Sequence, residues 1–487
     1  MAGMQIPSIR QTRRLLAQRK LSARELLQAH SARVASLNPT LNAIPTLCLD
    51  RADAEAKSID KVLSGQVSRQ RLGPLTAQPY AAKDMFDTEG VRTTYGSPIF
   101  SDRIPEKDAE IVKRIRHAGA VLIGKSNTPE FAAGSQTFNT VFGATKNPWD
   151  HTKTCGGSTG GGAVALATGM VTVADGSDLA ASLRNPANFC HVVGLRPSSH
   201  LEPRLQTGLN PFNTLSMVGP MARTVDDLRE IFLAIFDPNG CAPDRPLSDW
   251  VRIRDAQAKT QPRWRGRKKL RIGWAPTWGG LPVDHQVAEV MATIGSHLAG
   301  HQIELIEAFP TLPDFRSAFL SLRGEYFVAE FNELLQHHRD RLKDTVIWNI
   351  EQGLALKTAE LVRAQKIRHL TRQRLEQFMS LHQLDAIAGP CNQVLPFDVN
   401  TPYISEINSV PLETYIDWLA SNFMVTVAGL PALSLPAGFA RDRQTGCDLP
   451  VGLQLIGRWS EDLHLMAVAE HLESALSGIS RRSPPVS

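Results

Sequence analysis

The segment from residue 154 to residue 199 restricts the fold more than any other part of the sequence. It reads TCGGSTGGGAVALATGMVTVADGSDLAASLRNPANFCHVVGLRPSS, and small residues dominate it. Ser158 and Ser182 lie in two of its loops, where small neighbours let backbone N–H groups approach a reacting carbonyl. A layered α/β core is indicated, with a tightly packed helix at 162–170, a short strand at 171–174 and a turn at 175–182.

Further elements follow from residue spacing and from helix-end signals. Ser22 and Glu25 have the spacing of a capping box, which satisfies backbone N–H groups at the start of a helix. Gly119 can end a helix because glycine readily adopts the left-handed conformation of a C-terminal cap. We expect helices at 22–36, 50–64, 111–117 and 461–476, long helices within 314–382, strands at 120–123, 385–390, 425–439 and 449–456, and an irregular stretch at 391–412.

The composition is that of a globular protein without nucleic-acid or membrane partners. Of 487 residues, 42% are hydrophobic and only 21% are charged, which is enough material for a large core. The formal net charge of +5 is small, and the basic run at 263–271 is better interpreted as a solvated loop that leads into a strand. No apolar stretch is long enough to span a bilayer, and six scattered cysteines contain no C-x-x-C pair. We therefore expect a cytoplasmic protein.

Lys83, in PYAAKDMFD, is the best candidate for a base that acts together with the two serines. With the GGSTGG loop at 156–161 and the run GSDLAASLRNP at 176–186, it resembles the motifs of the amidase signature enzymes. Similar segments extend from SARELLQAHSARVASLNPTLNA near the N-terminus to LPVGLQLIG near the C-terminus. The resemblance implies an α/β fold in which helices cover both faces of a mixed central β-sheet. It predicts one domain over 1–487, with a catalytic core at 65–230, a surface excursion at 240–265 and a helical cap with the substrate pocket at 314–420.

The same resemblance implies a catalytic triad of Lys83, Ser158 and Ser182. Ser182 would attack the carbonyl and form an acyl-enzyme, while Ser158, after a cis peptide bond, would pass a proton to Lys83. This lysine must start as the neutral amine, and burial can lower a lysine pKa from about 10.4 by roughly 3–5 units. Asp84 would oppose that shift, but neighbours along a strand point to opposite faces.

The resemblance also assigns roles to the loop around Ser182. The backbone N–H groups of Leu179, Ala180, Ala181 and Ser182 match an oxyanion hole, in which one donor contributes about 3–4 kcal/mol at the transition state. The chain departs from the family here, because Ala180-Ala181 stands where Gly-Gly is usual, and this would strain the turn if either position needs positive φ. Asp178, Arg184 and Thr159 are expected to brace the loops rather than to transfer protons.

Two other motifs are weaker. Residues 119–126 satisfy the pattern G-x-x-x-x-G-K-S of a phosphate-binding loop, but here the four variable positions are themselves the expected strand. Residues 156–160 fit the G-x-S-x-G motif of α/β-hydrolases, which would make Ser158 a nucleophile beside a histidine. The preceding DHTKTC is not strand-like, and His191 is better interpreted as structural.

The substrate is expected to be a small-molecule carboxamide or anilide, cleaved at its C–N bond without a metal or another cofactor. Specificity should come from 200–215, 314–350 and 391–420, although core packing accounts equally well for most aromatic residues there. The candidate pocket residues are Phe212, Tyr326, Trp348, Tyr403 and Trp418. The sequence does not determine the oligomeric state, and a homodimer is compatible with it.

Two alternatives remain. The same triad would cleave carbamates or esters, because all these reactions pass through a tetrahedral intermediate. The resemblance also includes the amidotransferase subunit that amidates misacylated transfer RNA within a multi-subunit assembly. Against that subunit, SHLEPRLQTGLNPFNTLSMVGP lacks its usual arginine-tyrosine-glycine motif, and Met217 stands near the place of its aspartate.

Overall fold

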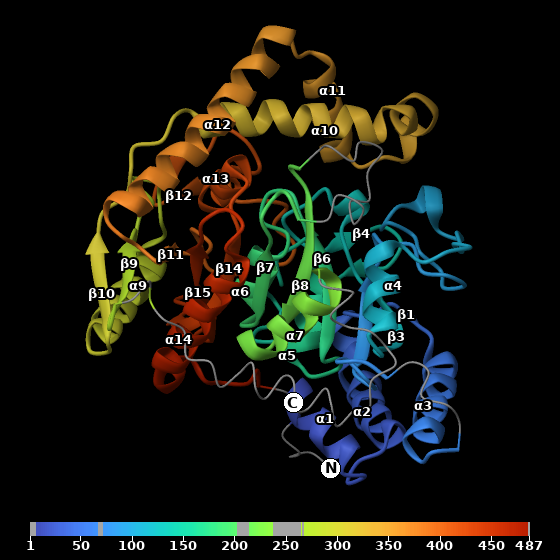
Figure 1. Cartoon of the computed structure of the whole chain (residues 1–487). Helices are drawn as coiled ribbons and strands as arrows, with labels where there is room; N and C mark the ends of the chain where they lie inside the picture. The colour runs from blue at the N-terminus through green and yellow to red at the C-terminus, as the bar shows by residue number, and fades with distance from the viewer. Residues whose placement is uncertain (1–5, 67–71, 202–213, 237–263, 265–266, 486–487) are drawn as a thin grey trace.

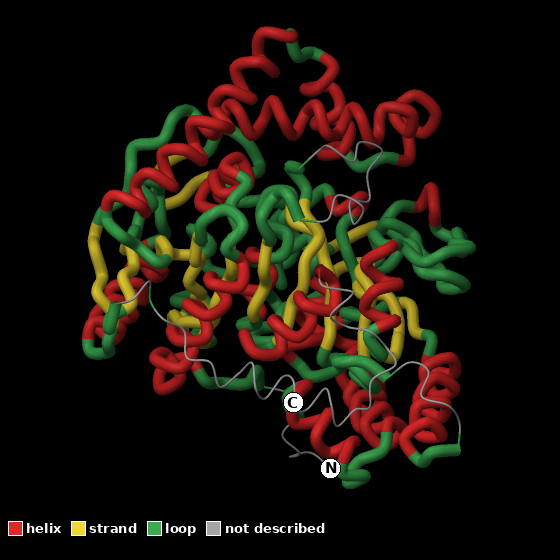
Figure 2. Tube along the Cα trace, in the orientation of Figure 1, coloured by secondary structure: helices red, strands yellow, loops and turns green. Residues whose placement is uncertain are grey.

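An 11-stranded mixed sheet with helices on both faces organises the part of the chain that the structure describes (Figures 1 and 2). This computed structural model describes residues 6–66, 72–201, 214–236, 264 and 267–485. Phe212 and nearly all of the expected excursion at 240–265 lie outside these ranges. The α/β architecture expected from the sequence, with a mixed sheet between helices, is confirmed.

The middle of the sheet brings distant segments of the chain together at one edge. The strand order is β1-β3-β2-β6-β8-β7-β14-β15-β11-β9-β10. The bounds are β1 (Thr46–Leu47), β2 (Pro79–Lys83), β3 (Val121–Ser126), β6 (Val173–Asp178), β7 (Val193–Arg196), β8 (Met217–Ala222), β9 (Leu270–Trp274), β10 (Ile303–Glu307), β11 (Ala386–Pro390), β14 (Ala432–Arg441) and β15 (Asp448–Ile456). Since β2 and β6 are parallel neighbours, Lys83 and Asp178 at their carboxyl ends lie at the same edge.

Alternation along the strands divides the core between the two faces of the sheet. Tyr80 and Ala82 of β2 belong to one apolar cluster and Ala81 to the other, as expected when successive side chains point to opposite faces. The first cluster includes residues of α1 (Ile9–Ala17), α4 (Glu110–His117), α7 (Val225–Phe236), α9 (His285–Ala299) and α14 (Asp462–Ser480). The second includes residues of α2 (Ala23–Leu41), α3 (Leu49–Leu63), α5 (Gly160–Ala167) and α6 (Arg184–Cys190).

A helical arm lies across the end of the sheet, at the top of Figure 1. It consists of α10 (Phe315–His338), α11 (Asp344–Leu354) and α12 (Thr358–Leu381). Phe319 of α10 stacks on Phe423 of α13 (Ala420–Ala428), with ring centroids 4.4 Å apart, and this contact joins the arm to the body. Short hairpins pair β4 (Phe138–Asn139) with β5 (Gly143–Ala144) and β12 (Glu406–Ile407) with β13 (Val410–Pro411).

Most of the expected elements are present. The capping box of Ser22 and Glu25 starts α2, which continues beyond 36 and ends at Asn42 in the left-handed conformation. The helices expected at 50–64, 111–117 and 461–476 and within 314–382 are confirmed, as are the strands at 385–390 and 449–456.

Two expectations are wrong. Val425 does not begin a strand, because residues 420–428 form α13, which ends at Gly429 with φ of 71°, and β14 starts only at Ala432. The expected turn at 175–182 begins too early, because β6 continues to Asp178 through antiparallel pairing with β8. Short apolar or small-residue runs do not distinguish helix, strand and turn by their periodicity.

Candidate active site

Lys83 and Ser158 meet at the end of β2. Nζ of Lys83 lies 2.7 Å from Oγ of Ser158 and 3.1 Å from Oγ of Ser177, and the lysine and Ser158 side chains are both fully buried. The peptide bond between Gly157 and Ser158 is cis, as the resemblance implied. These contacts bring together three hydroxyl- or amine-bearing groups from β2, β6 and the loop that precedes α5.

The glycines of this loop are required by close packing. A Cβ on Gly157 would lie 2.8 Å from the backbone of Gln136, and one on Gly161 would lie 2.3 Å from the backbone nitrogen of Asn127. Such distances do not occur between real Cβ atoms and backbone, so a side chain at either position would displace the loop. The small-residue pattern therefore fixes where Ser158 lies.

Burial disfavours the protonated form of Lys83. It lowers the pKa of Lys83 from 10.5 to about 7, against the opposing charges of Asp175 and Asp178. Asp84 does not take part, since its carboxylate accepts a hydrogen bond from Oγ1 of Thr94 at 2.5 Å. At neutral pH a substantial fraction of Lys83 is therefore the neutral amine.

The loop that carries Ser182 lies against the Ser158 loop. The backbone N–H of Thr159 donates to the carbonyl of Ser182 at 3.2 Å, and Ser158 and Ser182 line the same pocket. Among the described residues, no acceptor is recorded for the N–H groups of Ala180, Ala181 and Ser182, so these donors are available to a ligand. Neither alanine has positive φ, so the departure from Gly-Gly does not strain this turn.

A buried ion pair holds this loop. Arg184 forms two hydrogen bonds to the Asp178 carboxylate, Nε to Oδ2 at 3.0 Å and Nη2 to Oδ1 at 2.9 Å. Nη2 also donates to the carbonyl of Ala180 at 2.8 Å. Burial raises the pKa of Asp178, but the charges and hydrogen bonds of Arg184 and Arg196 outweigh it and lower the pKa overall. The pair therefore fixes the backbone on either side of Ser182, whereas Thr159 contacts the loop through its backbone.

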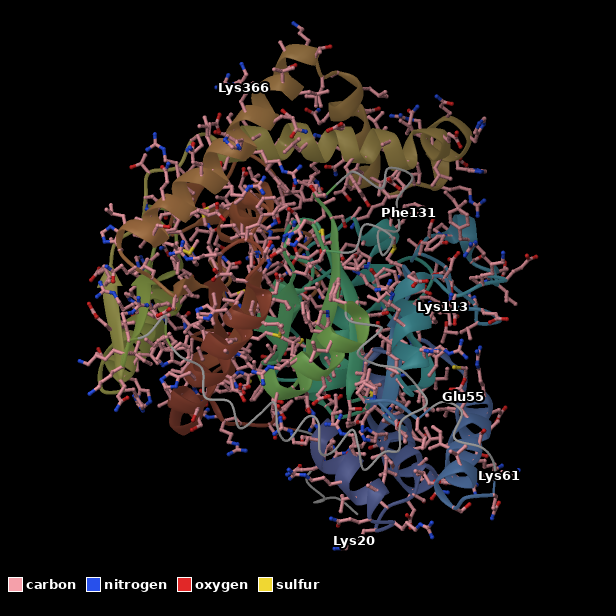
Figure 3. The ribbon with its side chains drawn as sticks, in the orientation of Figure 1. Lys20, Glu55, Lys61, Lys113, Phe131 and Lys366 are labelled. Atoms are coloured by element: carbon pink, nitrogen blue, oxygen red, sulfur yellow. The ribbon has the colours of Figure 1, made fainter. Side chains whose placement is uncertain are left out.

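The helical arm contributes one wall of the pocket beside the two serines, through residues of α10. The pocket contains about 650 Å³ of empty space, part of it open to solvent. Tyr326 and Phe327 of α10 line it, together with Phe131, whose ring centroid lies 5.0 Å from that of Phe331. Phe131 is labelled in Figure 3, below the helical arm in that view. Of the expected pocket residues, Tyr326 is thus present in this wall.

The remaining aromatic candidates lie elsewhere. Trp348 and Tyr403 line a second depression, which shares Gly134, Ser135 and Tyr415 with the first. Trp418 is 0% exposed and packs between Phe189 and Phe397 in the core, so it does not line the pocket. Phe212 lies outside the described residues.

Neither of the weaker motifs forms the site that its pattern suggests. Residues 121–126 are β3, so Lys125 lies inside a strand and contacts the carbonyl of Phe86 and Oγ1 of Thr88 instead of opening a helix. His191 lies 2.5 Å from the carbonyl of Ser480 through Nε2, and burial lowers its pKa to about 4. No histidine is among the described residues that line the pocket.

Sequence reasoning missed two residues of this site. Ser177 lies within the segment that was expected to be a turn. Because it is part of β6, it faces the same side of the sheet as Asp175, two residues earlier. Asp175 accepts a hydrogen bond from the backbone N–H of Lys83 at 2.7 Å. Arg323 interrupts the apolar face of a helix at a spacing of four residues from Phe319 and Phe327, and this pattern was available in the sequence.

The described residues contain no cluster of three or more His, Cys, Asp or Glu side chains arranged to hold a metal ion. Within the same residues, no helix combines the length and apolar character that crossing a bilayer requires. The described cysteines at 48, 155, 190, 391 and 447 are all free thiols.

Comparison with known proteins identifies relatives along almost the whole chain. The Amidase family model matches residues 25–466. The A-type subunit of glutamyl-tRNA(Gln) amidotransferase from Alkaliphilus metalliredigens is 31% identical over 517 aligned positions, which cover 98% of each protein.

Solved structures agree with this match. A structure described as "Crystal structure of amidase" is 25% identical, with a TM-score of 0.81 over 96% of this chain and 100% of that one. A second, described as "An unexpected vestigial protein complex reveals the evolutionary origins of an s-triazine catabolic enzyme", is 28% identical, with a TM-score of 0.80 over 98% and 99% of the two chains. The chain therefore belongs to the Amidase family of enzymes that act on carbon–nitrogen bonds.

Proposed function

We propose that the protein hydrolyses the C–N bond of a small-molecule amide through an acyl-enzyme on Ser182. The observation that carries this proposal is the 2.7 Å contact between Nζ of Lys83 and Oγ of Ser158, in a buried site where the pKa of Lys83 falls to about 7. A serine hydroxyl needs an adjacent base to become a nucleophile, and a neutral amine is such a base.

The proposed proton path uses the contact between Lys83 and Ser158. Ser182 loses its proton to Ser158 as it attacks the carbonyl carbon, and Ser158 gives its own proton to Lys83. Ser177 lies within hydrogen-bond distance of the same amine and fixes its direction. When the tetrahedral intermediate collapses, the proton returns through Ser158 to the departing amine, and water then releases the acid from Ser182.

The negative oxygen of the tetrahedral intermediate would be stabilised by the turn at 180–182. Its three N–H groups face no recorded protein acceptor among the described residues, and Ala180 and Ala181 line the pocket beside Ser182. Preorganised donors of this kind act on charge that develops only in the transition state. The same apparatus would cleave carbamates and esters, so the leaving group decides the preferred substrate.

A second candidate is an amidotransferase subunit that uses glutamine to amidate misacylated transfer RNA. The relative from Alkaliphilus metalliredigens, similar over nearly its entire length, favours this candidate, and on similarity alone it has the stronger support. Both candidates require cleavage of an amide at Ser182, and they differ in whether the nitrogen is released or passed to an acceptor. Only the second candidate function requires that the chain assemble with other subunits.

One set of assays separates these candidates. The purified chain would be given an anilide, a primary amide, a carbamate, an ester and glutamine, each with wild-type protein and with Ser182→Ala. We expect Ser182-dependent turnover of an anilide or primary amide by the chain alone. Turnover of glutamine only in the presence of co-purified subunits and misacylated transfer RNA would instead establish the amidotransferase, and equal activity of Ser182→Ala would reject both.

A further inference from the structure

One charged side chain occurs among the described residues that line the catalytic pocket, and the described residues supply no counter-ion for it. Arg323 of α10 is 5% exposed, and its guanidinium lies over the ring of Phe327, with Cζ 4.7 Å from the ring centroid. Within the described chain, no carboxylate lies at ion-pair distance from it. An arginine on the same helix, Arg316, is fully paired, with Asp417 and Glu413 at 2.8 Å.

The neighbours of Arg323 fix its direction without neutralising it. Nε donates to Oδ1 of Asn349 at 2.7 Å, and Nη2 donates to the hydroxyl of Tyr415 at 2.8 Å. Both acceptors are neutral, and the structure records no acceptor for Nη1 within the residues it describes. Because an arginine has five N–H donors in a planar fork, one edge of this guanidinium remains available in the pocket.

Tyr415 supplies a second free donor at the same place. Its hydroxyl oxygen already accepts two hydrogen bonds, from Nη2 of Arg323 and from Nδ2 of Asn349, each at 2.8 Å. A phenol accepts at most two hydrogen bonds and donates one. Its own proton therefore points away from both partners, and Tyr415 lines the pocket.

We infer that Arg323 and Tyr415 bind a carboxylate of the substrate, so that the preferred amides carry such a group away from the scissile bond. A planar carboxylate matches the free edge of a guanidinium, and a buried cation without a partner is otherwise unfavourable. This inference rests on the proposed amide cleavage at Ser182. It also fits glutamine, whose α-carboxylate is separate from its amide.

Two pairs of anilides test the inference and show on which side of the amide the carboxylate lies. In the first pair, N-phenylsuccinamic acid carries a carboxylate on the acyl side of the amide and butyranilide does not. In the second pair, 4-acetamidobenzoate carries a carboxylate on the amine side and acetanilide does not. We expect the wild-type enzyme to prefer the acid of one pair by roughly 10–100-fold in kcat/KM, the range of a hydrogen-bonded charge pair. Equal kcat/KM within both pairs would overturn the inference.

Variants separate substrate binding from a structural role. Arg323→Met should remove the preference by raising KM for the acid far more than KM for the neutral amide, while Arg323→Lys should restore part of the preference. Tyr415→Phe, which removes only a hydroxyl, should lower the preference by roughly 3–10-fold. The matched control Arg316→Met should keep the preference. An equal loss for acid and neutral amide in both pocket variants would show that Arg323 only holds the helices together.

Direct binding distinguishes failure of this inference from failure of the proposed function. Isothermal titration of wild-type protein would compare succinate with butyrate and 4-aminobenzoate with aniline. If the ligand with the additional carboxylate binds more tightly in one of these pairs, and Tyr415→Phe loses this difference, the site is supported even if none of the four anilides is hydrolysed. Hydrolysis of the neutral anilides without any carboxylate discrimination in binding would reject the site and keep the amidase.

Discussion

Replacing Lys83 with methionine tests the buried amine through protein stability, independently of turnover. Because the native pKa of Lys83 is about 7 and the usual value is 10.5, the unfolded chain binds more protons between these two values. The free energy of unfolding therefore rises with pH in this window, by about 1.4 kcal/mol per unit. The gain is complete above the unfolded-state pKa and is lost as the pH falls to the native one.

The corresponding experiment is urea denaturation of both proteins at several pH values. From about pH 7.5 to about pH 9.5, wild-type protein should gain roughly 2–3 kcal/mol relative to Lys83→Met. Lys61→Met, which removes an exposed lysine of α3, provides the baseline. Parallel pH dependences of wild type and Lys83→Met would mean that the native lysine is an ordinary ammonium, and the proposed proton path would then fail.

Three other predictions concern the same loops. On the acidic side of about pH 7, kcat/KM should fall about tenfold per pH unit as Lys83 becomes protonated, and a flat profile between pH 5 and 8, measured with a neutral anilide, would contradict the neutral amine. Arg184→Met removes both arginine hydrogen bonds of the buried Asp178 carboxylate and leaves it only the more distant Arg196 at 3.8 Å among the described cations. It should lower the unfolding free energy by about 3–5 kcal/mol in urea titrations, where a loss below about 1 kcal/mol would be inconsistent with a bracing role. Changing Ala180 and Ala181 together to glycine should leave kcat within about threefold, because neither has positive φ, and a large rate increase in the anilide assay would show that the alanines do strain the turn.

The parts of the site that depend on local sequence could be predicted, and those that depend on pairing could not. The two serine loops were evident from their small residues, and contacts such as that of Gly157 with Gln136 explain why. Ser177 was missed because its strand exists only through the register with Val218 of β8, which is not visible in either segment alone. Trp418 was wrongly assigned to the pocket because the sequence around an aromatic residue does not distinguish a pocket wall from a core.

The fold shows the same difference between local and long-range information. Helices with end signals, such as α2 after Ser22, were located correctly at their starts. The run at 425–439 contains both the end of α13 and the beginning of β14, and its apolar residues are buried in either conformation. Only Gly429, which ends the helix in the left-handed conformation, marks the boundary in the sequence.

The proposed reacting groups and the opposite wall of the pocket come from separate stretches of the chain. Lys83, Ser158 and Ser182 lie within residues 83–182, whereas Arg323, Tyr326 and Tyr415 belong to residues 315–415. Substitutions among these residues of the pocket wall are expected to change which substrates fit while the proposed reacting groups stay the same. We expect a chimera that carries the later stretch from another family member to acquire the donor's substrate range while retaining the recipient's nucleophile.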